Sequence, residues 1–171
     1  MNPDPRHQDG CATWHGHLLA GIIASYEQCI YIEIGVLNGE CWRLAAPHAA
    51  EAHGVDVQDC EPVMAGIGRF WHLPSDDFFT AYDGAPPDVI FVDGEHVKPW
   101  CERDARNALE LIAPYGTVVL HDSQPTKGPG MRRHEELCGQ VWEVRERLER
   151  DATLECFTFQ RFPGVTLVRK R

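Results

Sequence analysis

The hydrophobic positions of this chain follow two periods that alternate along its length. Short β-branched and aromatic runs, typical of strands buried on both faces of a parallel sheet, are separated by segments whose apolar residues recur with helical spacing. The predicted strands are CIYIEIG at 29–35, GVDV at 54–57, FWHLP at 70–74, DVIFVDG at 88–94 and GTVVLHD at 116–122. The predicted helices are 13–28, 40 to about 53, a helix capped by Ser75, 100–112 and 135–150. Pro47 is expected to end or kink the second helix.

The end of the chain departs from this alternation. LECFTFQ at 154–160 and VTLVRK at 165–170 are strand patterns joined by a turn, which predicts an antiparallel hairpin. The fold class is therefore α/β: a three-layer α/β/α sandwich with a Rossmann-like, mostly parallel sheet and a C-terminal antiparallel hairpin. Ligands of such sheets bind beyond the carboxyl ends of the strands. We expect one crevice to collect the residues at four such ends, Gly35, Asp56, Asp93 and Asp122.

The length of 171 residues favours a single domain, 1–171. Within it, 1–12 is predicted to be a polar lead-in and 123–134, rich in Pro, Gly and basic residues, an active-site loop. No apolar run approaches the ~20 residues of a membrane span, and the N-terminus lacks the pattern of a signal peptide. We therefore expect a cytoplasmic protein without a membrane partner.

The composition narrows the possible partners. With 43% hydrophobic residues the chain is an ordinary globular protein, and its net charge of −10 argues against nucleic acid and is compatible with cationic ligands or metal ions. Its seven cysteines form no C-x-x-C pair, which favours buried thiols over disulfides or a zinc site. The apolar stripe of the first helix needs a partner surface and is compatible with a homodimer; it comprises Trp14, Leu18, Ile22 and Tyr26.

A glycine-containing loop follows the first predicted strand of the sheet. In Glu33-Ile-Gly35-Val-Leu-Asn-Gly39 the glycines let backbone amides approach a ligand at the start of a helix. The spacing differs from the dinucleotide fingerprint G-x-G-x-x-G and matches the E/D-x-G-x-x-x-G loop of class I S-adenosylmethionine-dependent methyltransferases. At the end of the next strand, the Asp56 carboxylate could accept both ribose hydroxyl protons.

The likeness to that class extends over most of the chain, from about 31 to 170. The segments that carry it, in order, are SDDFF, DVIFVDGEH, GTVVLHDS, CGQVWEV and FPGVTLVRK. This order resembles the small bacterial class I methyltransferases of the "family 24" type, in which phrases like IDGxH and VLHD recur at this spacing. Two departures are a tyrosine, Tyr115, where glycine is usual, and a short region between Asp56 and Phe70.

The resemblance implies roles for the cofactor loop and the residues that follow it. Glu33, Gly35 and Gly39 would hold the methionine part of S-adenosylmethionine, and Asp56 its ribose. The adenine would be bordered by Ser75 and Asp76, and Asp93 is a further candidate for the cofactor amine. The alternatives are a tight turn without a ligand for the glycines and a helix cap or surface acid for Asp56.

Asp93 and Asp122 form a second group of candidates. Adjacent parallel strands place their terminal carboxylates within reach of one hard cation such as Mg²⁺. His121 is a candidate third metal ligand, although strand alternation points it away from Asp122 unless the backbone turns there. The alternative is that both acids are polar groups at strand ends.

His96 follows Asp93 by three residues, on the side where an acceptor hydroxyl would approach the methyl group. An imidazole there can take the hydroxyl proton, and D-x-x-H resembles the base-bearing motif of some metal-dependent sugar O-methyltransferases. The three candidate catalytic residues are thus His96, Asp93 and Asp122. The alternative for His96 is a capping or surface histidine, and His15 and His17 are predicted to be structural or exposed.

The basic cluster of the predicted active-site loop comprises Lys127, Arg132, Arg133 and His134. Arg132 and Arg133 could bind an anionic acceptor, such as a uronate or a nucleotide sugar, through Arg–oxygen pairs. The alternative is a solvated charge cluster.

Together these features predict an S-adenosylmethionine-dependent O-methyltransferase that acts on a small-molecule hydroxyl of sugar or natural-product type with Mg²⁺ assistance. Two other classes stay open. A nicotinamide-dependent oxidoreductase could use a similar sheet, and a non-catalytic module could retain the cofactor loop without methylating anything.

Overall fold

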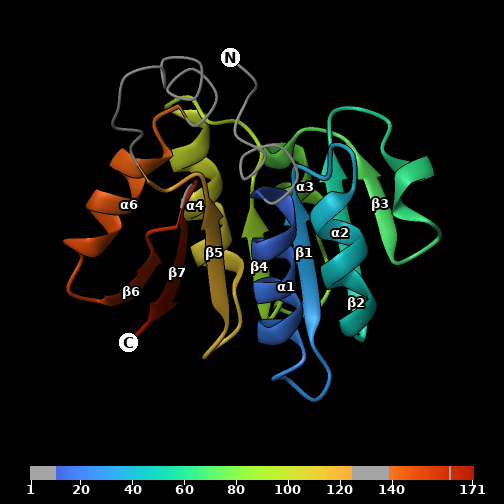
Figure 1. Ribbon diagram of the computed structural model, residues 1–171, viewed down its shortest axis with the longest axis horizontal. Helices are drawn as coiled ribbons and strands as arrows, with labels where there is room; N and C mark the ends of the chain where they lie inside the picture. The colour runs from blue at the N-terminus through green and yellow to red at the C-terminus, as the bar shows by residue number, and fades with distance from the viewer. Residues whose placement is uncertain (1–10, 125–138, 162) are drawn as a thin grey trace, which may run out of the picture.

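The computed structural model describes residues 11–124, 139–161 and 163–171, which form a seven-stranded sheet between helices (Figure 1). The strands are β1 (Ile30–Ile34), β2 (Glu51–Asp56), β3 (Arg69–His72), β4 (Val89–Val92), β5 (Thr117–His121), β6 (Leu154–Phe159) and β7 (Val165–Lys170). Their order is β3-β2-β1-β4-β5-β7-β6, with β7 antiparallel to both neighbours and all other pairs parallel. The predicted fold class and C-terminal hairpin are confirmed.

Helices cover both faces of this sheet, because its central strands are apolar on both sides. The helical segments are α1 (Cys11–Ile23), α2 (Glu40–Ala45), η2 (Ala46–His48), η3 (Glu61–Met64), α3 (Ser75–Ala81), α4 (Trp100–Leu111) and α6 (Val141–Glu149). Tyr31 of β1 packs with α1 and α2, whereas its neighbour Ile32 packs on the other face with α3, α4 and α6. Figure 1 shows α1 and α2 in front of the sheet and α4 behind it.

The first helix differs from its prediction in extent and in the face that it buries. It begins at Cys11, inside the predicted lead-in 1–12, and ends at Ile23, where the Ser25 hydroxyl donates to the Ile22 carbonyl at 2.6 Å. The predicted stripe that starts at Trp14 is only half-buried. The fully buried stripe lies one residue later and comprises His15, Leu19 and Ile23. This face packs against α2 and the sheet.

The second predicted helix is too long. It ends at Ala45 and gives way to a 3-10 turn containing Pro47, and β2 then begins at Glu51, paired with Ile30 of β1. Proline lacks the amide hydrogen that a continuing helix needs. The residues from Glu51 onward form hydrogen bonds with β1 instead. At the other end of the chain, α6 is described from Val141, and 135–138 lie outside the described residues.

The thiols behave as their spacing predicts. The described cysteines form no disulfide; Cys29, Cys41, Cys60 and Cys101 are buried, and Cys156 is half-buried. None of the helices in the described ranges combines the length and the apolar character needed to cross a membrane.

Candidate active site

A cleft of about 770 Å³ opens at the carboxyl ends of the parallel strands. The four residues predicted to meet there all line it: Gly35, Asp56, Asp93 and Asp122. Glu33, Ser75 and Asp76 also line this cleft. Gly39 is not; it lies at the start of α2 with φ +70°, and a Cβ there would be 3.0 Å from the Val63 carbonyl oxygen. Glycine at this position allows the turn before α2 and does not contribute to the cleft surface.

Gly35 is required by the close approach of two strand ends. Its amide donates to the Val55 carbonyl at 2.8 Å, and its φ is +92°. A Cβ at this position would lie 2.3 Å from the carbonyl oxygen of Asp93, far inside van der Waals contact. Only glycine allows β1 to leave the sheet directly beside the end of β4.

Glu33 is a carboxyl group placed inside the sheet. It is 1% exposed, and the Tyr31 hydroxyl donates to its Oε2 at 2.7 Å. Burial raises the pKa of Glu33 to about 8, although the hydrogen bond from Tyr31 opposes this shift. At neutral pH the ligand-free site therefore holds Glu33 largely in its neutral form.

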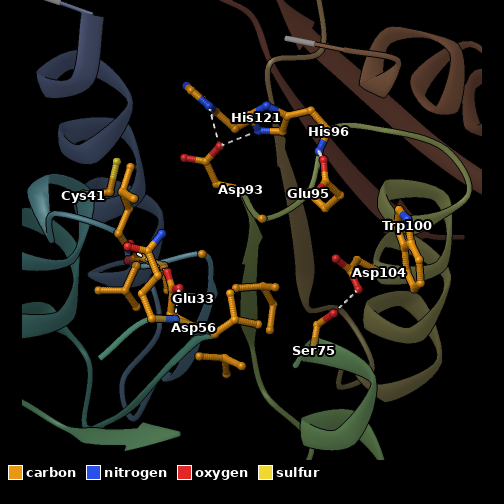
Figure 2. Close-up of a pocket in the computed structure, with 18 of the residues that line it drawn as sticks. Glu33, Cys41, Asp56, Ser75, Asp93, Glu95, His96, Trp100, Asp104 and His121 are labelled. Atoms are coloured by element: carbon orange, nitrogen blue, oxygen red, sulfur yellow. Dashed lines mark hydrogen bonds and ion pairs between the residues drawn. The ribbon is translucent and has the colours of Figure 1, made fainter. Parts of the chain in front are cut away.

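Asp56 braces the loop that contains Gly35. Its Oδ2 accepts the Leu37 amide at 2.9 Å, and its Oδ1 accepts the Gln58 amide at 2.8 Å. The carboxylate thus ties the loop after β1 to the segment after β2 while it lines the cleft. Figure 2 shows Glu33 and Asp56 on the same side of the pocket.

The predicted helix cap at Ser75 is wrong. Pro74 occupies the cap position, and the Ser75 hydroxyl donates instead to Oδ1 of Asp104 on α4, at 2.6 Å. Asp76 is engaged by an ion pair with Arg103. Sequence reasoning did not identify Asp104, although its position among the buried residues Cys101, Ala105 and Ala108 of α4 was an available signal.

The acids at the ends of β4 and β5 are bridged by imidazoles. His121 Nδ1 lies 2.8 Å from Asp93 Oδ1 and 3.4 Å from Asp122 Oδ2. His96 Nε2 lies 3.4 Å from Asp93 Oδ1 and 3.2 Å from Asp122 Oδ2. One ligand atom each from Asp93, His96 and Asp122 lies within 4.8 Å of the others. The three predicted catalytic residues therefore meet at one point, and Figure 2 shows Asp93 linked to both rings.

A backbone turn at Asp122 explains why His121 contacts this acid. Strand alternation alone would point this ring away from Asp122, but Asp122 has φ +52°, so the chain leaves the strand pattern there. The Nδ1 atom of His121 contacts the carboxylates, and its Nε2 is buried without a hydrogen-bond partner among the described residues. The structure thus places His121 as a partner of both acids, outside the three residues whose ligand atoms converge.

The charges of this cluster support one another. Burial alone would raise the pKa of Asp93, but the charge and hydrogen bond of His121 hold it below its ordinary value. Burial likewise opposes protonation of His121, yet Asp93 and Asp122 raise its pKa well above the usual range. The site therefore contains a half-buried ion pair between Asp93 and His121.

His15 reaches this cluster from α1. Predicted to be structural or exposed, it is 3% exposed and lines the cleft, with its ring centroid 4.2 Å from that of His121. Burial, followed by the charge of His121, lowers the pKa of His15 to about 4, so its ring is neutral. The helical spacing of His15 with Leu19 and Ile23 was the signal for its burial. The predicted basic cluster, including Arg132 and Arg133, lies outside the described residues.

The family model described as a methyltransferase domain, of the family 24 type, matches residues 32–123, more than half of the chain. The chain belongs to this family. The match covers the Gly35 loop, Asp56, Asp93 and Asp122, and it favours methyl transfer over the nicotinamide-dependent alternative. None of the curated protein sequences compared with this chain matches it.

Solved methyltransferase structures share the fold. The Podospora anserina methyltransferase PaMTH1, bound to S-adenosylhomocysteine, is 15% identical over 92% of this chain and 78% of its own, with a TM-score of 0.72. An O-methyltransferase from Bacillus cereus in complex with the same product is 13% identical over 92% and 80%, with a TM-score of 0.71. The mycinamycin-pathway methyltransferase MycE, bound to Mg and S-adenosylhomocysteine, is 18% identical over 86% and 46%, with a TM-score of 0.62.

Proposed function

We propose that this protein transfers the methyl group of S-adenosylmethionine to a hydroxyl group of a small molecule. The observation that carries this proposal is the meeting of Asp93, His96 and Asp122 in the same cleft as the Gly35 loop. One part of the cleft has the backbone shape for a nucleoside cofactor, and the adjacent part has the acids and the imidazole for activating a hydroxyl. Acceptors of sugar or natural-product type fit the acidic protein better than nucleic acid does.

The glycine-loop part supports binding of the cofactor. A volume of about 770 Å³ is within the range of roughly 300–1,000 Å³ that small-molecule sites occupy. Gly35 lets the loop pass in close contact with Asp93 at the end of β4. Asp56 holds the loop in place by accepting a hydrogen bond from the Leu37 amide. Glu33 and Asp93 face the same cleft, and the ionised Asp93 suits the cationic amine and sulfonium of this cofactor. The structural relatives PaMTH1 and the Bacillus cereus enzyme were solved with its product.

The two carboxylates also fit a divalent cation. Asp93 and Asp122 lie at the ends of adjacent parallel strands, and Mg²⁺ needs only one or two carboxylates besides water and substrate oxygens. The bound cation would lower the pKa of the acceptor hydroxyl. MycE, which shares this fold, was solved with Mg.

His96 is the proposed general base. This residue lies on the loop after β4. Its Nε2 lies 3.2 Å from Asp122 Oδ2. The proton of the acceptor hydroxyl moves to the ring nitrogen of His96 that carries no hydrogen, as the hydroxyl oxygen forms a bond to the methyl carbon. The carboxylates of Asp93 and Asp122 stabilise the imidazolium that forms. S-adenosylmethionine held at the Gly35 loop would supply the methyl group, and its sulfur would keep the electron pair of the broken carbon–sulfur bond and leave as S-adenosylhomocysteine. Positioning of the acceptor in line with the leaving sulfur supplies much of the rate.

Two measurements test this function. Calorimetric titration with S-adenosylhomocysteine is expected to show one site per chain, whereas NAD is expected not to bind. Transfer of labelled methyl to a panel of sugars and phenols is expected to occur, to stop in EDTA and to return with Mg²⁺. Absence of nucleoside binding contradicts the proposal as a whole. Binding without transfer to any hydroxyl favours the non-catalytic module. Full activity in EDTA contradicts only the role of the cation and leaves the rest of the proposal standing.

A further inference from the structure

Asp104 on α4 is a buried acid that the proposed chemistry does not use. It is 3% exposed, lines the cleft, and accepts the Ser75 hydroxyl at its Oδ1. Among the described residues, no hydrogen bond reaches its second oxygen, Oδ2. A Cβ built on Gly94 would lie 3.6 Å from Oδ2, which places this oxygen beside the end of β4. Figure 2 shows one oxygen of Asp104 linked to Ser75 and the other turned toward the pocket.

This oxygen borders the cleft and is available to a ligand there. A ligand that covers it without donating a hydrogen bond would incur the cost of removing a carboxylate oxygen from water. Burial raises the pKa of Asp104, and the hydrogen bond from Ser75 opposes the shift only partly. An ionised carboxylate only accepts hydrogen bonds, so the group that completes this site must donate one.

A flat aromatic surface lies beside this oxygen. Trp100 is four residues before Asp104 on α4, hence on the same helix face, and it lines the cleft with 49% of its surface exposed. The Arg103 guanidinium lies over the indole ring, 4.3 Å from its centroid. A planar ring packed against Trp100 would carry a substituent within reach of Asp104.

The neighbouring acid Asp76 is already occupied. It forms an ion pair with Arg103 and accepts a hydrogen bond from Asn107 Nδ2 at 3.5 Å. Asp76 therefore holds the Arg103 guanidinium over the Trp100 ring. Asp104, by contrast, offers its Oδ2 to the cleft as a hydrogen-bond acceptor.

We propose that Asp104, and not Asp76, selects the base of the cofactor, with its Oδ2 accepting a hydrogen bond from the exocyclic amino group of adenine while Trp100 packs against the ring. This inference rests on the proposed function, because it places S-adenosylmethionine in the cleft. It assigns base specificity to a helix that follows β4, where Ser75 fixes the carboxylate by holding its other oxygen.

The test compares two nucleosides that differ in one substituent. S-inosylhomocysteine carries a carbonyl in place of the amino group of S-adenosylhomocysteine. By titration calorimetry, the wild-type protein is expected to bind the adenosyl compound at least about tenfold more tightly than the inosyl compound. The inosyl compound cannot donate a hydrogen bond from this substituent to the carboxylate, and its carbonyl oxygen would face the Oδ2 acceptor of Asp104. In Asp104→Asn the amide presents a donor, and the preference is expected to disappear or reverse.

Asp77→Asn, which removes an exposed acid of α3 outside the cleft lining, is the matched control and is expected to leave the affinity ratio within about threefold of wild type. Asp76→Asn tests the rival assignment and is expected to change the ratio less than Asp104→Asn does. The melting temperature of ligand-free Asp104→Asn is expected to equal or exceed that of wild type, because a desolvated charge is removed; a purely structural role predicts a fall.

Equal wild-type affinity for both compounds overturns the inference without any variant. So does an unchanged ratio in Asp104→Asn, or a shift in Asp76→Asn instead. If S-adenosylhomocysteine binds in these cases, the proposed function stands and only the assignment of Asp104 falls. If neither compound binds to the wild-type protein, the proposed function fails together with this inference.

Discussion

The cleft has two halves that are built by different means. The glycine-loop half, 33–39 with Asp56, is shaped by backbone: the Gly35 amide bonds to Val55, and Asp56 accepts the Leu37 amide. The carboxylate half consists of two acids and two imidazoles in contact with one another: Asp93, Asp122, His96 and His121. Substitutions in the first half should therefore damage shape and stability, whereas those in the second should damage chemistry and leave the fold intact.

The largest effect is expected from Gly35→Ala. Its Cβ would lie 2.3 Å from the Asp93 carbonyl oxygen on a backbone with φ +92°, so the ends of β1 and β4 must separate. We expect a loss of about 3 kcal/mol or more in the free energy of unfolding, measured by urea denaturation, and loss of S-adenosylhomocysteine binding.

Gly66→Ala is the control for this change. Its φ of +73° is similar, but its Cβ would meet no atom within 4 Å. It should cost only about 1–2 kcal/mol, the penalty of the left-handed backbone. Equal costs for the two variants would show that the contact with Asp93 does not matter.

Asp122→Asn tests the other half. Removal of one charge from the pair of acids is expected to lower methyl transfer at least about 100-fold. Because Asp122 lies at the end of β5, outside the Gly35 loop, the dissociation constant of S-adenosylhomocysteine should stay within about threefold of wild type. Initial rates and calorimetry measure the two quantities. Asp83→Asn, an exposed acid, should change neither, and a parallel loss of affinity and rate in Asp122→Asn would erase the distinction between the halves.

The smallest effect concerns Glu33, a charge within the glycine-loop half. Because burial raises its pKa from 4.5 to about 8, the folded protein holds a proton in this range that the unfolded chain releases. The free energy of unfolding should therefore fall as pH rises through this range, by at most about 1.4 kcal/mol per pH unit.

Glu33→Gln should flatten this slope and stabilise the protein at the upper end of the range. Urea denaturation of both proteins at about pH 5.5 and about pH 7.5 measures the difference. The Asp93–His121 pair is retained in both proteins and also titrates, so the comparison isolates Glu33. Identical slopes would contradict a raised pKa for Glu33.

The positions of the strand ends could be predicted from sequence because the signals are local. A buried apolar run that stops at Gly35, Asp56 or Asp93 shows both the strand and its end within a few residues. The helix after Gly39 was predicted too long because its pattern continues after Pro47, while pairing of β2 with β1 determines the strand start at Glu51. Ser75 was assigned as a cap because its competing partner, Asp104, is distant in the sequence.

The sequence by itself determined which elements form and which acids and glycines stand at their ends, since hydrophobic period and glycine conformation act over a few neighbouring residues. Only the tertiary structure decided which side chains meet. The register of β5 on β4 puts His121 beside Asp93, and the turn at Asp122 brings its carboxylate to the same ring. Helix α1 brings His15 beside His121, and α4 brings Asp104 to Ser75. These contacts arise from packing between elements far apart in the chain, and no local pattern encodes them.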